Sequence, residues 1–139
     1  MHESILPEGW KPPVGYANGI LAAPGRVLYM AGQVGWTAQQ EFTSAELVPQ
    51  FRQALENILA ILREAGGLPE HLVRITAFCV DRREYLAARP ELGRIWRELM
   101  GRHYPAMSMI FVADLLDHPA RIELEATAVI PDPAPTTQA

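Results

Sequence analysis

Residues 121–130 read Arg121-Ile122-Glu123-Leu124-Glu125-Ala126-Thr127-Ala128-Val129-Ile130, and apolar and polar side chains alternate along them. A period of two over this length predicts a strand with one buried face and one polar face. A second strand-forming run precedes it, Tyr104-Pro105-Ala106-Met107-Ser108-Met109-Ile110-Phe111-Val112. The connection at 114–120 carries turn residues but is longer than a tight hairpin needs. The sequence therefore predicts two consecutive strands at this end of the chain.

The rest of the chain predicts two helices and three further strands. A helix should start just after Glu46, with Pro49 in its first turn and Gly66-Gly67 at its end. A second helix is predicted from about Arg89 to Met100, after a turn at 81–84. A strand is expected at 72–80, and runs 16–23 and 27–34 are expected to form a hairpin around Pro24-Gly25. Gly32 in the second run suggests a bulge or a close approach to the backbone.

The predicted order is β-β-α-β-α-β-β, a two-layer α+β domain with helices on one face of a sheet. We expect one domain over 1–131, which begins with a leader or short extended segment at 1–15, and a disordered tail over 132–139. The face of the sheet without helices bears polar and small residues, which suggests that another copy of the chain covers it. The sequence predicts no internal repeat.

Composition limits the classes of partner. The net charge is -4 and the pI is near 5.5, which argues against a nucleic-acid backbone as the main partner. A single cysteine, Cys79, excludes an internal disulfide framework and a cysteine zinc site. No apolar run approaches the length of a membrane span, so we expect no membrane partner and a cytoplasmic location. His71, His103 and His118 lack metal-ligand spacing, and no metal site is predicted.

Five segments, taken in order, resemble the RidA/YjgF family of reactive-intermediate (enamine/imine) deaminases. They are Pro13-Val14-Gly15-Tyr16-Ala17, Leu28-Tyr29-Met30-Ala31-Gly32-Gln33-Val34, Gln53-Ala54-Leu55-Glu56-Asn57-Ile58, Tyr104-Pro105-Ala106-Met107-Ser108 and Ile122-Glu123-Leu124-Glu125-Ala126. The resemblance covers nearly the whole chain. It implies a chorismate-mutase-like fold and a homotrimer with small-molecule clefts between subunits, working without a metal or other cofactor.

The resemblance also implies roles for individual residues. Glu123 matches the glutamate that orients the hydrolytic water, Gly32 matches a glycine whose backbone lines the cleft, and Tyr16 matches a tyrosine that helps to close it. Met107 stands where the family carries an arginine that grips the substrate carboxylate with two hydrogen bonds. Methionine has no donor for that contact. We therefore expect poor activity on small 2-imino acids, and a substrate that depends less on its carboxylate.

Alternatives remain open for each of these residues. Glutamates on a strand face are more often solvated than catalytic, and we regard Glu125 as structural. Met107 and Met109 are either filler in a core or interface, or the wall of an apolar cleft. Arg102 and Arg121 are candidates to replace the missing arginine.

Two functions therefore compete. One is an enamine/imine hydrolase of altered specificity that uses Glu123, and the other is a trimer that binds a small molecule in the same cleft without turnover. The acidic charge balance counts against a third, the ribonuclease or translation-inhibitor label attached to the family.

Overall fold

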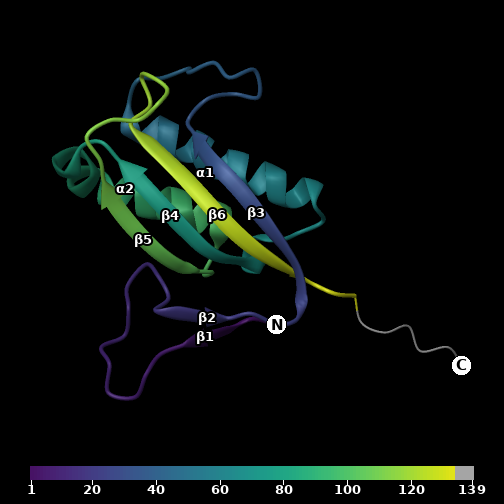
Figure 1. The fold of residues 1–139 in the computed structure, drawn as a ribbon. Coiled ribbons are helices and arrows are strands. Elements are labelled where there is room, and N and C mark those ends of the chain that lie inside the picture. The colour runs from purple at the N-terminus through teal and green to yellow at the C-terminus, as the bar shows by residue number, and fades with distance from the viewer. Residues whose placement is uncertain (134–139) are drawn as a thin grey trace, which may run out of the picture.

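The computed structural model describes residues 1–133 and has two layers, a four-stranded sheet and two helices packed on one of its faces (Figure 1). The sheet order is β3-β6-β4-β5, with β3 at Gly25–Val34, β6 at Ile122–Pro131, β4 at Leu72–Cys79 and β5 at Ala106–Phe111. The helices are α1, Leu47–Glu64, and α2, Arg82–Met100, and a short 3-10 helix, Pro69–His71, precedes β4. The predicted α+β class and two-layer arrangement are confirmed.

The alternating stretch forms β6, which lies in the interior of the sheet between β3 and β4 and pairs antiparallel with both. Its apolar positions are buried toward the helices, as predicted: Ile122, Leu124, Ala126, Ala128 and Ile130. Glu123 and Glu125 point to the opposite face, because successive side chains of a strand alternate in direction. The two C-terminal strands are consecutive in sequence but are not neighbours, since β4 lies between them.

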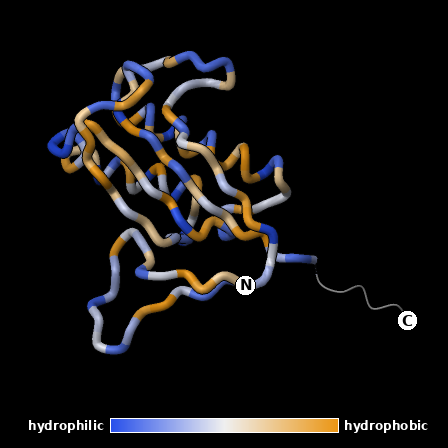
Figure 2. The backbone as a smooth tube through the Cα atoms, viewed as in Figure 1, coloured by the Kyte–Doolittle hydropathy of each residue, from blue (hydrophilic) through white to orange (hydrophobic). Residues whose placement is uncertain are grey.

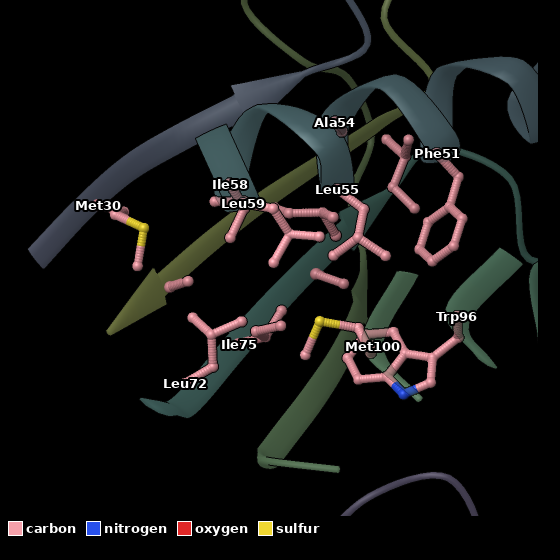
Figure 3. Close-up of a cluster of buried hydrophobic side chains, with 14 of the residues drawn as sticks. Met30, Phe51, Ala54, Leu55, Ile58, Leu59, Leu72, Ile75, Trp96 and Met100 are labelled. Carbon is pink, nitrogen blue, oxygen red and sulfur yellow. The ribbon is translucent and has the colours of Figure 1, made fainter. Parts of the chain in front are cut away.

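Helix α1 lies across the sheet and supplies much of the core. Leu55, Ile58 and Leu62 are completely buried. Figure 3 shows Leu55 and Ile58 with Ile75 of β4 and with Trp96 and Met100 of α2. Burying one such aliphatic side chain contributes roughly 1.5–3 kcal/mol. Figure 2 shows hydrophobic and hydrophilic residues along both helices, as expected for helices with one buried face. The predicted start is confirmed, because Glu46 is the N-cap and Pro49 lies in the first turn.

Helix α2 begins seven positions earlier than predicted, and the turn predicted at 81–84 is wrong. Asp81 is the N-cap, and its side chain accepts a hydrogen bond of 3.0 Å from the backbone N–H of Glu84. Pro90 lies inside the helix, where the sequence analysis placed the start. Capping by Asp81 and the packing of Tyr85 and Ala88 against the core extend the helix through that proline.

The predicted hairpin of 16–23 with 27–34 is also wrong. Strand β2, Gly19–Leu21, pairs antiparallel with β1, Glu3–Ile5, in a separate two-stranded sheet that Figure 1 shows beyond one end of the main sheet. Strand β3 pairs with β6 instead. His2 links the two sheets, because its ring accepts from the N–H of Ala23 (2.9 Å) and lies 2.7 Å from the carbonyl oxygen of Val129. Pro24-Gly25 is therefore a junction between sheets.

Two further expectations concern the ends of the elements. The bulge predicted near Gly32 is confirmed, because the pairing of β3 with β6 shifts between Met30 and Gln33. The predicted tail over 132–139 falls mainly on residues 134–139, which lie outside the described residues. Within residues 1–133, neither helix has the length and apolar character needed to cross a membrane.

Candidate functional site

A cleft of about 440 Å³ lies between α2 and the edge strand β5. Aromatic and thioether side chains form much of its wall. Trp96 of α2 and Tyr104 stack with ring centroids 5.9 Å apart and planes inclined by 12°. The Trp96 indole N–H donates to the carbonyl oxygen of His103 at 3.0 Å, which fixes the ring while leaving its face available for packing.

Tyr16 reaches this cleft because its segment runs beside the start of β5. The N–H of Ala17 donates to the carbonyl oxygen of Pro105 at 3.0 Å, and Ala17 forms a parallel bridge with Ala106. Tyr16 and Met107 consequently line the same cleft. The structure thus brings together two of the residues singled out in the sequence, although ninety positions separate them.

Met107 and Met109 face the helices. They pair in parallel with Ile75 and Ala77 of β4, whose side chains belong to the core. Both methionines are half-buried, pack against that core and line the cleft. The two interpretations left open by the sequence are therefore compatible, because the same side chains fill the core margin and make the cleft wall apolar.

Glu123 and Gly32 meet on the other face of the sheet. A Cβ atom added to Gly32 would lie 2.6 Å from Oε1 of Glu123, so the carboxylate occupies the space that a side chain would fill. Glu123 forms no ion pair or hydrogen bond through its carboxylate with any of residues 1–133. Burial raises the pKa of Glu123, and the nearby charges of Asp117 and Glu125 raise it further.

One protomer therefore holds the predicted site residues as two separate groups. Glu123 of β6 lies opposite Phe78 of β4 in the sheet. The next residue of β6, Leu124, faces the helices and lines the cleft with Met107. Because Glu123 and Met107 project from opposite faces, the sheet separates them. The sequence analysis expects the cleft between subunits, and within one chain these residues do not line a single cleft.

Comparison with known proteins supplies the family. A family model described as Endoribonuclease L-PSP matches residues 10–130. The chain is 34% identical to the RutC family protein PM1466 of Pasteurella multocida over 105 residues, covering 76% of this chain and 81% of that protein. The chain belongs to the RidA/YjgF family. Within the family, the structure of the conserved Rid protein YyfB from Yersinia pestis matches with a TM-score of 0.83 and 34% identity, covering 93% of this chain and 98% of that one.

A more distant relative carries an activity in its name. The chain is 27% identical to the Escherichia coli protein named "Putative reactive intermediate deaminase TdcF" over 108 residues, covering 76% of this chain and 80% of that protein. The fold and family inferred from the five sequence segments are thus confirmed for this Rid protein.

Neither arginine proposed from the sequence lines the cleft of this Rid protein. Arg121 is held by carboxylates, with Nε donating to Glu84 at 2.7 Å and Nη2 lying 3.8 Å from Asp81. Arg102 is exposed and is not part of the cleft wall. Two arginines of α2, Arg89 and Arg97, line it instead. Sequence reasoning missed them, although their spacing of four residues on either side of Gly93 places all three on one helix face.

Other reactive side chains of this Rid protein are engaged elsewhere. Among the described residues, no three His, Cys, Asp or Glu side chains cluster as a metal site would require. Cys79 is buried, and burial raises the pKa of its thiol, which disfavours the nucleophilic thiolate.

Proposed function

We propose that this Rid-family protein is a hydrolytic enamine/imine deaminase of altered substrate specificity, with a ligand cleft completed between subunits of a homotrimer. The observation that carries the proposal is the Glu123 carboxylate, which lies against the bare backbone of Gly32 with no partner among residues 1–133. A carboxylate with a raised pKa and no partner is a stronger base than an ordinary glutamate and is suited to accept a proton.

The proposed chemistry assigns one step to each group. Glu123 accepts a proton from water as the water oxygen bonds to the carbon of the C=N group, and the electron pair of the C=N bond moves to nitrogen. Glu123 then returns this proton to the nitrogen, and the hydroxyl proton of the tetrahedral adduct also passes to the nitrogen as the C–N bond breaks and the C=O bond forms. The products are a carbonyl compound and ammonia, so imine and water are converted without an oxidant or reductant.

The separation of Glu123 from Met107 is the reason to assign the site to two copies. The cleft lies at the β5 edge of one protomer, and Glu123 lies on the helix-free face of the sheet. A second copy packed across that face can bring its Glu123 and Gly32 to the first copy's Tyr16, Met107 and Met109. Large apolar side chains on β3 also support an interface, since Tyr29 is 80% exposed and Val27 is 50% exposed in one protomer.

We expect the purified protein to be a trimer at micromolar concentration. Sedimentation equilibrium should give a mass three times that of the 15.4 kDa chain. Tyr29→Lys should weaken the assembly, because it places a charge where an apolar side chain would be buried. The matched control is Leu116→Lys, in a loop outside the sheet where the native side chain is 94% exposed. A monomeric parent protein would remove the basis for a shared cleft.

The test of the proposed function is hydrolysis of imines generated in situ from amino acids, measured against pH. The cleft wall around Met107, Met109 and Trp96 is apolar and a methyl group fills it poorly, so we expect slow turnover of 2-iminopropionate and faster turnover of imines with larger apolar groups. The acidic limb of the rate profile should lie above the usual range of a glutamate, because burial raises the pKa of Glu123 and the protonated carboxyl group cannot accept a proton. The rate should therefore fall as pH drops through that raised pKa.

The variant Glu125→Gln tests whether the acidic limb of this profile belongs to Glu123. Removing the neighbouring negative charge should move the acidic limb to lower pH, because Glu125 contributes to raising the pKa of Glu123. The rate of imine breakdown without protein must be subtracted at each pH. Absence of turnover across all imines and pH values would reject the deaminase proposal.

The second candidate is a trimer that binds a small molecule in the same cleft without turnover. The observation favouring it is the apolar, aromatic cleft wall, with Met107 where the resemblance calls for an arginine. Saturable ligand binding without hydrolysis would select this function. A cytoplasmic location remains a prediction from the sequence under either proposal.

A further inference from the structure

The face that α2 turns toward the cleft combines two cations with an apolar wall. Tyr85, Arg89, Gly93 and Arg97 recur every four residues, and all four line the cleft. Gly93 leaves space between the arginines. A Cβ atom added there would lie 3.5 Å from Nη1 of Arg97, so this guanidinium extends back over Gly93, toward the N-terminal end of α2.

Both guanidinium groups are available to bind a ligand. Arg89 and Arg97 are exposed, and neither has a carboxylate within 4.0 Å among residues 1–133. Two of the three acids of α2 pair elsewhere, Glu98 with Arg52 of α1 and Glu84 with Arg121. The third, Glu91, lies two positions from Arg89, a spacing at which helix side chains do not face each other. Two cations without partners at the edge of an apolar cleft favour a small organic anion.

The apolar part of the cleft lining restricts the rest of the ligand. Met107, Met109 and Leu124 close the floor of the cleft, and Trp96 and Tyr104 provide a stacked aromatic pair. These side chains suit a branched or aromatic group better than a methyl group, since only a larger group can displace water from a cleft of about 440 Å³.

We propose that Arg97 and Arg89 of α2 bind the substrate carboxylate. They replace the arginine that the family carries at the position of Met107 on β5. The substrate is then an imine or enamine with a carboxylate at one end and a bulky apolar group against the Trp96 and methionine wall. This inference rests on the proposed function for the reacting group, but the anion site itself concerns binding alone. A guanidinium fork forms paired hydrogen bonds with a carboxylate, whereas an ammonium acts as a point charge.

Isothermal titration calorimetry with two unreactive probes tests the anion site. The first probe is 4-methyl-2-oxopentanoate, which has the carboxylate, and the second is 4-methylpentan-2-one, which has the same apolar chain and carbonyl without it. We expect the parent protein to bind the acid at least about 10-fold more tightly than the ketone, since hydrogen bonds between a guanidinium and a carboxylate are charge-assisted.

The double variant Arg89→Ala/Arg97→Ala should lose that preference and still bind the ketone as the parent does. Arg97→Lys should keep part of it, because the charge remains but the fork is lost. Arg94→Ala is the matched control, because Arg94 is exposed on the same helix but does not line the cleft. Arg94→Ala should bind both probes like the parent. All three residues are exposed, so the variants should fold, and equal trimer mass would verify this.

The inference is overturned if the parent binds the acid no more tightly than the ketone, or if the double variant keeps the preference. Failure of the proposed function has a different outcome. Binding of the acid that depends on these arginines, together with no hydrolysis of any imine, would support the anion site and reject the deaminase.

Discussion

Glu123→Gln should reduce imine hydrolysis by about 10²–10⁴-fold, the usual contribution of a positioned general acid or base. The amide keeps the size of the side chain but cannot accept the proton of the attacking water. Binding of 4-methyl-2-oxopentanoate should change little, because the carboxylate is assigned to α2 and not to β6. A fall in turnover with unchanged ligand affinity is the signature of a group that acts on the reacting water.

Stability separates this role from a structural one. Burial raises the pKa of Glu123 above its value in the unfolded chain, so the charged form that is present at neutral pH destabilises the folded state. At neutral pH the variant Glu123→Gln should therefore be at least as stable as the parent. If Glu123 were a structural residue, the variant would lose stability and activity together. Undiminished hydrolysis by a well-folded variant would contradict the proposed mechanism.

Gly32→Ala provides an independent test of the same position. The added Cβ would lie 2.6 Å from Oε1 of Glu123, so the carboxylate must move away from the backbone. The rate should fall although Glu123 is still present. The matched control is Gly19→Ala, where an added Cβ makes an ordinary contact of 3.8 Å with Ile5.

Gln50→Leu should lower the free energy of unfolding by about 3–5 kcal/mol, a large part of the roughly 5–15 kcal/mol of a typical domain. Gln50 is 1% exposed and joins three segments through its side chain. Nε2 donates to the carbonyl oxygens of Ser44 (2.9 Å) and Pro119 (3.0 Å), and Oε1 accepts from the N–H of Arg121 (2.7 Å). Leucine fills similar space but leaves these three backbone groups without partners.

Thermal unfolding at a fixed protein concentration measures this effect, and we expect a Tm lower by about 10 °C. The control is Gln53→Leu, one turn further along α1, where the half-buried side chain donates only to Oδ1 of Asn57. That variant should lie within about 1 kcal/mol of the parent. Similar losses for the two variants would show that the buried hydrogen bonds of Gln50 have no special importance.

The sequence by itself determined the elements whose pattern is local. Alternation along 121–130 predicted β6 and its buried face, and helical spacing with Pro49 in the first turn predicted α1. Both predictions rest on the short period with which side chains recur on one face of a strand or helix, so neighbouring residues are sufficient to reveal them. Five segments taken in order also indicated the family, although Met107 departs from one of the motifs.

Only the tertiary structure decided which segments meet. Strand β2 pairs with β1 and not with β3, and the contact of His2 with Val129 near the C-terminal end of β6 holds the N-terminal segment in place. Helix α2 continues through Pro90 because a cap and core contacts outweigh one unfavourable residue. The site depended most on non-local pairing. Register places Glu123 and Met107 on opposite faces, and the packing of α2 on β5 brings Arg89 and Arg97 to the cleft, where no local motif marked them.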